Sequence, residues 1–164
     1  MDMLLAVLIH MLVALARFTK LLSRVGIGQY DEWKPGCKLK ILLVGYNGAR
    51  NTGADVRVAA IARQLKQIFD SDKIEITVMA LDTENLKGYF DPDVNLYKFT
   101  TAFPLPLYRA CSVNHMVIIA EGSALKSTFA DALTLFFCEA SGIMRSQKKP
   151  CIAMVLRRAI WTVF

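Results

Sequence analysis

The sequence of 164 residues has few of the features that build metal sites or disulfide frameworks. Its four cysteines are widely separated, none belongs to a CxxC pair, and no histidine is placed to complete a zinc motif. This spacing excludes the common zinc-binding classes. We therefore expect no metal and a reducing, cytoplasmic compartment, with Cys138 and Cys151 as small core residues.

The motifs of nucleic-acid and nucleotide binding are also missing. No RRM, zinc-finger, KH or basic-zipper pattern occurs, and the chain has neither a Walker A nor a GxGxxG motif. Internal repeats and low-complexity tracts are absent as well. We therefore expect no nucleic-acid partner, although the net charge is +6.

The positive charge is concentrated in one part of the chain. Residues 36–66 hold six basic residues against one acid, whereas residues 67–100 hold seven acids against three bases. A basic region of this kind suits an anionic small molecule or an anionic membrane. Solvated faces of an α/β domain explain the same pattern without any ligand.

An apolar stretch, Met3–Ala16, lies at the N-terminus and is interrupted only by His10. Fourteen residues of helix extend about 21 Å, less than the ~30 Å hydrocarbon core of a bilayer. A cleaved signal peptide is disfavoured, because the charged residue ahead of the stretch is the acidic Asp2.

Basic residues follow the apolar stretch at Arg17, Lys20 and Arg24. A spanning anchor and a helix lying in the interface would both leave these residues on the cytoplasmic side. We predict a hydrophobic membrane-anchor helix at residues 1–25, which holds the domain at the cytoplasmic membrane. A helix packed on the domain is the alternative. Residues 26–37, with three glycines and a proline, are predicted to be a linker.

Residues 38–164 show strands alternating with helices, which indicates one Rossmann-like α/β domain with a parallel sheet flanked by helices. The apolar patterns predict strands at 38–45, 73–81, 94–99, 115–122 and after Pro150, and helices at 54–69 and 127–144. The segment 103–114 contains two prolines and is predicted to be a loop with one helical turn at most.

Two loops follow the carboxyl ends of predicted strands, where open parallel sheets bind their ligands. The first, "GYNGARNTGAD", lets backbone approach a ligand and ends at a helix N-terminus, which favours an anion. Arg50 adds a charge for a phosphate or carboxylate. The second loop, "AEGSALKST", is weaker, and a plain turn explains either loop without a ligand.

These loops carry the residues that we predict to line a substrate. No catalytic base is predicted. The predicted substrate-binding residues are Gly45, Asn47, Arg50, Asn51, Gly53, Gly122 and Ser123.

Taken together, the two loops resemble those of the polysaccharide pyruvyl transferase family, in its N-terminal half. The likeness covers residues 39–153, and it departs from the family pattern at Ala54 and Glu121. The family usually has Gly-Asp where Ala54 separates the two residues here, and a glycine where Glu121 stands. The matching residues are Gly45, Asn51, Gly53, Asp55, Gly122 and Ser123.

The resemblance implies a two-domain GT-B-like fold and a transferase of cell-surface polysaccharide synthesis. Such enzymes move a pyruvyl group from phosphoenolpyruvate to a sugar hydroxyl and form a ketal. By this resemblance the N-terminal domain faces the acceptor, a sugar or lipid-linked glycan, and the second domain holds phosphoenolpyruvate. The donor is a substrate, and no separate cofactor is implied.

The tail "MVLRRAIWTVF" does not fit the family layout, which has a strand, a glycine-rich loop and then a second domain. A one-nucleotide change of frame in suitable codons would restore such a loop, so we expect a truncated chain that is inactive alone. The alternatives are a genuine short protein, a nucleotide- or sugar-phosphate-binding module without chemistry, a fragment of another GT-B glycosyltransferase, and a structural fragment.

Overall fold

The computed structural model describes residues 31–99, 105–120 and 131–154, with the side chains of the last segment described from residue 134. It also describes nine positions nearer the N-terminus, namely 10, 13–14, 17–19, 21–22 and 25. The second predicted loop and the tail after residue 154 lie outside the described residues. So do most of residues 1–30.

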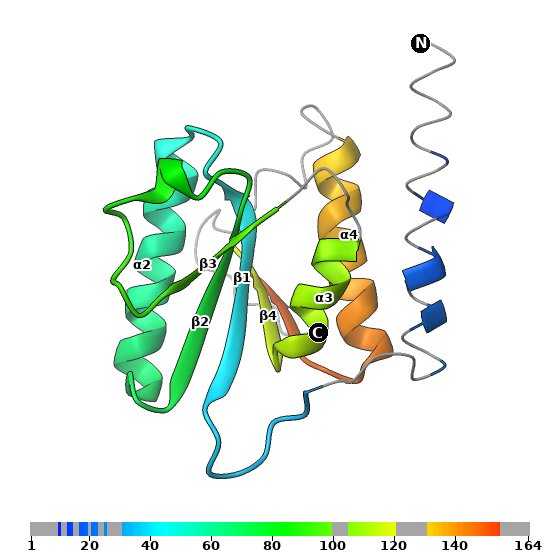
Figure 1. Ribbon diagram of the computed structural model, residues 1–164, viewed down its shortest axis with the longest axis horizontal. Coiled ribbons are helices and arrows are strands. Elements are labelled where there is room, and N and C mark those ends of the chain that lie inside the picture. Colours follow the sequence, from blue (N-terminus) through cyan, green and yellow to red (C-terminus); the bar gives the residue numbers. More distant parts are fainter. Residues whose placement is uncertain are drawn as a thin grey trace.

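Five parallel strands form one sheet in the order β3-β2-β1-β4-β5 (Figure 1). The chain adds β2 and β3 on one side of β1 and then β4 and β5 on the other side, as in Rossmann-like folds. All pairings are parallel, which confirms the predicted parallel α/β architecture. The strands are β1 (Leu39–Asn47), β2 (Ile74–Ala80), β3 (Asn95–Lys98), β4 (Met116–Ile119) and β5 (Cys151–Ala153).

Helices cover both faces of the sheet (Figure 1). Helix α2 (Thr52–Phe69) lies on one face, whereas α3 (Leu105–Val113) and α4 (Asp131–Ser146) lie on the other. A short 3-10 turn, η1 (Glu84–Leu86), lies between β2 and β3. The predicted helix at 54–69 is therefore confirmed, and it begins two residues earlier than expected.

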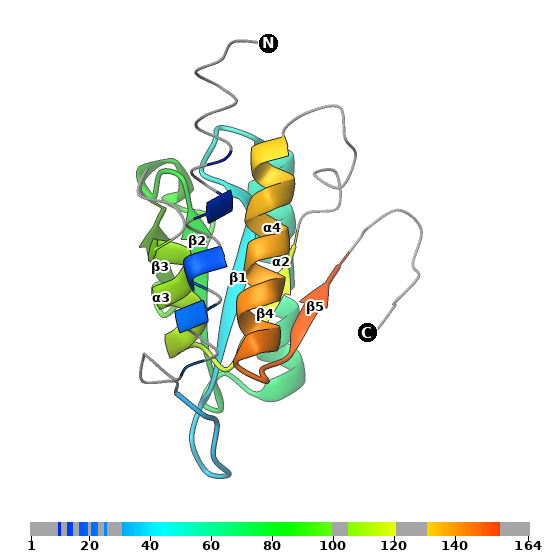
Figure 2. The ribbon, with the colours of Figure 1, turned by 90° about the vertical axis from the view of Figure 1, so that its right-hand side faces the viewer.

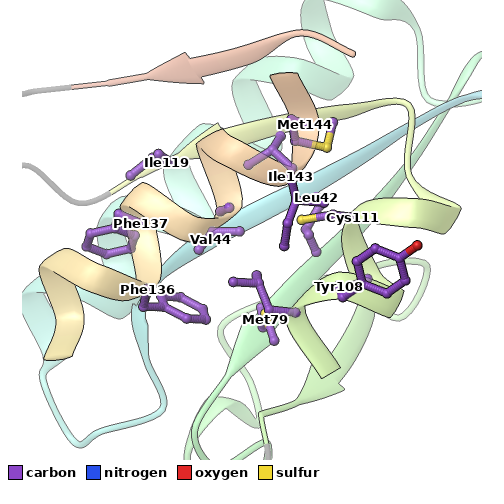
Figure 3. Close-up of a cluster of buried hydrophobic side chains, with 14 residues drawn as sticks. Leu42, Val44, Met79, Tyr108, Cys111, Ile119, Phe136, Phe137, Ile143 and Met144 are labelled. Carbon is purple, nitrogen blue, oxygen red and sulfur yellow. The ribbon is translucent and has the colours of Figure 1, made fainter. Parts of the chain in front are cut away.

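The central strand β1 divides the core into two clusters. Its residues 41–44 are all fully buried, as a strand covered on both faces requires. Because side chains alternate along a strand, Leu42 and Val44 pack toward α3 and α4, while Ile41 and Leu43 pack toward α2. Figure 3 shows the first cluster, in which Phe136 and Phe137 of α4 lie beside Val44.

The segment predicted as a loop, 103–114, contains the nine-residue helix α3, so that prediction is wrong. Pro106 is the second residue of α3, where the missing N–H would have no helical partner. The far end of α3 is capped by Lys149, whose Nζ donates to the carbonyls of Ser112 at 2.7 Å and Asn114 at 2.8 Å. Burial lowers the pKa of Lys149.

The four cysteines are free, but their exposure differs from the prediction at one position. Cys138 is exposed on α4 and is not a core residue, because the buried stripe of this helix passes through Phe137 and Ala140 instead. Cys37 is also exposed, whereas Cys111 lies in the core between α3 and the sheet. Burial raises the pKa of the Cys111 thiol.

Thiol alkylation should separate these cysteines. The thiolate is the reactive form, so we expect Cys37 and Cys138 to react with iodoacetamide in the native protein. Cys111 should react more than about 100-fold more slowly, because its thiol is buried and protonated until the core opens. Peptide mass spectrometry with and without denaturant measures these rates. Equal labelling of Cys111 and Cys138 in the native protein would contradict the packing of α3.

The described part of the N-terminal segment is helical and contacts the α4 side of the domain. Thr19 is fully buried and its Oγ1 donates to Oε1 of Glu139 at 2.7 Å, while Leu22 packs against the core cluster of α3 and α4. Among the residues that the structure describes, no helix has both the length and the apolar character needed to cross a membrane. The predicted membrane-anchor helix at residues 1–25 lies largely outside the described residues and stays a prediction.

Candidate functional site

The reversal of strand order places the candidate site at the carboxyl ends of β1 and β4. These strands pair from Ile41 with Met116 to Val44 with Ile119, and the N–H of Ala120 donates to the Val44 carbonyl at 2.8 Å. A reversal of this kind opens a crevice outside the sheet, where ligands of open α/β folds bind. The described loop at these strand ends is the β1–α2 loop.

A bulge at the end of β1 turns the chain into that loop. The pairing of β1 with β2 shifts register between Leu43 and Asn47. Asn47 is fully buried, and its Nδ2 donates to the Met79 carbonyl at 2.9 Å. A Cβ on residue 45 would lie 3.0 Å from the Asn47 Oδ1, so a larger residue than Gly45 would crowd the Asn47 side chain.

Gly48 is fixed in the next turn by contacts from three directions. Its φ is +72°, and a Cβ here would lie 2.2 Å from the Asp82 carbonyl oxygen. The Gly48 N–H donates to Oδ1 of the buried Asp55 at 2.9 Å, and the Gly48 carbonyl accepts from Nδ2 of Asn85 at 2.8 Å. The loop is therefore held rigidly against β2 and α2 before any ligand binds.

The N-terminus of α2 is open to solvent beside this braced turn. Asn51 is the N-cap, with its carbonyl accepting from the N–H groups of Ala54 at 3.0 Å and Asp55 at 3.1 Å. Arg50 is exposed and has φ of 58°, a left-handed conformation that few non-glycine residues adopt. The exposed residues Thr52 and Gly53 at the start of this 18-residue helix and the Arg50 guanidinium favour an anion, next to the buried carboxylate of Asp55.

The predicted site residues fall into three groups. Arg50, Asn51 and Gly53 are exposed together at the start of α2. Gly45 and Asn47 lie beneath the loop, where Asn47 braces β2, and Oδ1 of this buried amide has no hydrogen-bond partner. Gly122 and Ser123 belong to the loop after β4, which lies outside the described residues.

Three residues that hold the loop were not among the predicted site residues. Gly48 and Asp55 belong to the first predicted loop. Their hydrogen bond could not be predicted, because it depends on how the turn between them folds. Asn85 lies 37 residues from Gly48 in the chain, so only the fold brings it to the Gly48 carbonyl. The one local signal for it is its place in a polar turn directly after β2.

A second polar group lies at the opposite, amino-terminal edge of the sheet. Nζ of Lys40 lies 2.5 Å from Oδ2 of Asp31, and this hydrogen bond lowers the pKa of Asp31 and raises that of Lys40. His115 is buried, with Nδ1 accepting the Lys40 N–H at 3.0 Å and Nε2 lying 3.6 Å from Oδ1 of Asp31. This group ties residue 31 to β1 and β4.

A hollow of about 620 Å³ lies at this same amino-terminal edge. It is lined chiefly by apolar groups, including Trp33, Leu39 and Phe69, with Lys38 and Lys73 beside them. It is far from the strand reversal, and ligands of open parallel sheets bind at the carboxyl edge instead. We therefore locate the candidate site at the β1–α2 loop.

A search for metal-ligand clusters and a comparison with known proteins give no further assignment of the site. In the described ranges, no three side chains of histidine, cysteine, aspartate or glutamate gather as metal ligands would. Comparison of the chain with protein-family models, curated proteins and solved structures finds no match. The fold and site therefore define a Rossmann-like α/β domain with a candidate anion site, and the family resemblance stays a prediction.

Proposed function

We propose that this domain is the acceptor-binding half of a polysaccharide pyruvyl transferase-like enzyme with a GT-B-like design. The observation that carries the proposal is the braced β1–α2 loop at the strand reversal, which exposes Arg50 and the first residues of α2. A phosphate or carboxylate group of a sugar or lipid-linked glycan would bind there. Pyruvyl transfer would then use phosphoenolpyruvate held by a second domain.

The proposal assigns the acceptor to this domain and the donor to a second domain, which predicts how the 164 residues behave alone. They form a single five-stranded sheet in the described part, and the proposal assigns phosphoenolpyruvate to the other wall of the cleft. We therefore expect these 164 residues to bind an acceptor without releasing phosphate from phosphoenolpyruvate. Ketal formation by the purified chain would overturn this assignment.

The alternative is a non-catalytic module that holds a nucleotide or sugar phosphate, and the same exposed helix N-terminus favours it. A fragment of another GT-B glycosyltransferase would also use this fold. Binding that requires the sugar favours the acceptor assignment, whereas equal binding of nucleotides without a sugar favours the module.

Isothermal titration calorimetry with sugar phosphates tests the site directly. Replacing Arg50 with glutamine should weaken binding by about tenfold or more, because a charge-assisted hydrogen bond is worth about 1.5–3 kcal/mol. Arg63→Gln is the matched control, since Arg63 is exposed on the same helix further from its N-terminus. Equal affinities of the two variants for the sugar phosphate would show that Arg50 does not contact the ligand.

We also propose that the domain works at the cytoplasmic face of the membrane, where lipid-linked acceptors would be available. The support is the apolar N-terminal stretch followed by three basic residues.

A further inference from the structure

The described residues between positions 10 and 25 include side chains that contact the domain and side chains that are exposed. One face contacts the domain through the buried Thr19 and through Leu22, which packs on the α3–α4 core. The other face exposes Phe18, Leu21 and Val25, which are 51%, 54% and 59% accessible. Residues spaced by three and four lie on the same side of a helix, and the Val25 N–H donates to the Leu21 carbonyl at 3.0 Å, as in a helix.

The exposed apolar stripe lies beside the contact between this segment and the domain. The described residues lie outside α4, on the same side of the sheet as α3 and α4 (Figure 1 and Figure 2). Thr19 and Leu22 face the domain, and the stripe of Phe18, Leu21 and Val25 lies about a quarter-turn around the helix from them, where it is more than half exposed. Three exposed large apolar residues in one stripe form a surface that favours a partner.

The charges beside the stripe identify the partner. Arg17 is exposed next to Phe18, and the sequence adds Lys20 and Arg24 with no acidic residue between Asp2 and Asp31. A helix with an apolar stripe and only basic charges is suited to lie in the surface of an anionic bilayer.

We infer that the helical segment with Phe18, Leu21 and Val25 on its exposed side lies at the boundary between the domain and an anionic lipid surface. Phe18, Leu21 and Val25 enter the acyl boundary, while Thr19 and Leu22 keep the helix attached to α4. The α3–α4 side of the domain then faces the membrane. This inference deepens the proposed membrane association but does not depend on the acceptor site, so failure of either test leaves the other proposal intact.

Tryptophan substitution in the full 164-residue protein tests the orientation. The indole introduced by Phe18→Trp should be quenched when vesicles contain brominated phosphatidylglycerol, whereas that from Leu22→Trp should not be. The unsubstituted protein supplies the background of its two native tryptophans. Equal quenching at both positions would overturn the inference, because the helix would then have left the domain. Absence of quenching at both positions would also overturn it and would favour a protein partner.

A flotation assay measures how much the apolar stripe contributes. The combined variant Phe18→Ser, Leu21→Ser and Val25→Ser should bind vesicles of phosphatidylglycerol and phosphatidylcholine at least about tenfold more weakly than the unsubstituted protein. The control variant carries Val56→Ser and Ile68→Ser, which are 52% and 71% exposed on α2 across the sheet. Unchanged binding by the first variant, with native circular dichroism, would overturn the lipid contact. Equal binding to phosphatidylcholine alone would overturn the role of the basic residues.

Discussion

Replacing Gly48 with alanine should lower the free energy of unfolding by about 3 kcal/mol, a decrease in Tm of roughly 6 to 12 °C. Two physical costs add. A left-handed backbone costs an alanine about 1–2 kcal/mol, and the φ of Gly48 is +72°. The new Cβ would also lie 2.2 Å from the carbonyl oxygen of Asp82, so backbone must move. Thermal unfolding followed by circular dichroism measures the effect.

Gly88→Ala is the control for this substitution. Gly88 also has a positive φ, +85°, but a Cβ there meets nothing within 4 Å. It should therefore lose only the conformational cost, about 1–2 kcal/mol. If the two variants were equally stable, the close contact between Gly48 and Asp82 would not exist, and the β1–α2 loop would not be braced as described.

Replacing Asp55 with alanine should cost about 2 to 3 kcal/mol in the free energy of unfolding. The Gly48 N–H would lose its acceptor, and an unsatisfied buried donor costs about 1–3 kcal/mol. The N-terminus of α2 would also lose a favourable negative charge, worth about 0.3–1 kcal/mol. Urea unfolding of the variant, analysed by linear extrapolation, gives the difference.

Asp55→Asn is the matched variant, because an amide oxygen can still accept the Gly48 N–H. Its cost should be about 1 kcal/mol, mainly from the charge at the helix N-terminus. A loss equal to that of Asp55→Ala would mean that the charge matters more than the hydrogen bond. The bracing of the loop by Asp55 would then be incorrect.

The sequence predicted those parts of the fold that depend on local pattern. The apolar run of β1 and the spacing of Val58, Ile61 and Ala62 in α2 require only neighbours in the chain, and both elements formed as expected. The parallel arrangement of the strands was predicted from the general rules for crossovers, whereas their order was not predicted. The helix α3 was missed because its segment contains two prolines, although Pro106 is tolerated as the second residue of the helix.

The location of the candidate site stays a prediction, whereas the structure shows what each described residue of the loop contacts. The rule that parallel sheets bind ligands at their carboxyl edge led to the β1–α2 loop, and Arg50 and Gly53 are exposed there. Asn47 was expected to line the ligand, yet its amide donates to Met79 across the sheet. Chain spacing cannot tell an asparagine that faces a ligand from one that braces a strand.

The most direct test is a titration of the isotope-labelled protein with a sugar phosphate, followed by amide chemical shifts. If the account is correct, the largest changes occur at Arg50, Asn51 and Gly53, because these exposed residues lie at and just before the start of α2. Little should change near Trp33 and Leu39, which line the hollow at the other edge of the sheet. Shifts confined to that hollow, or no shifts at the β1–α2 loop at saturating ligand, would contradict the account.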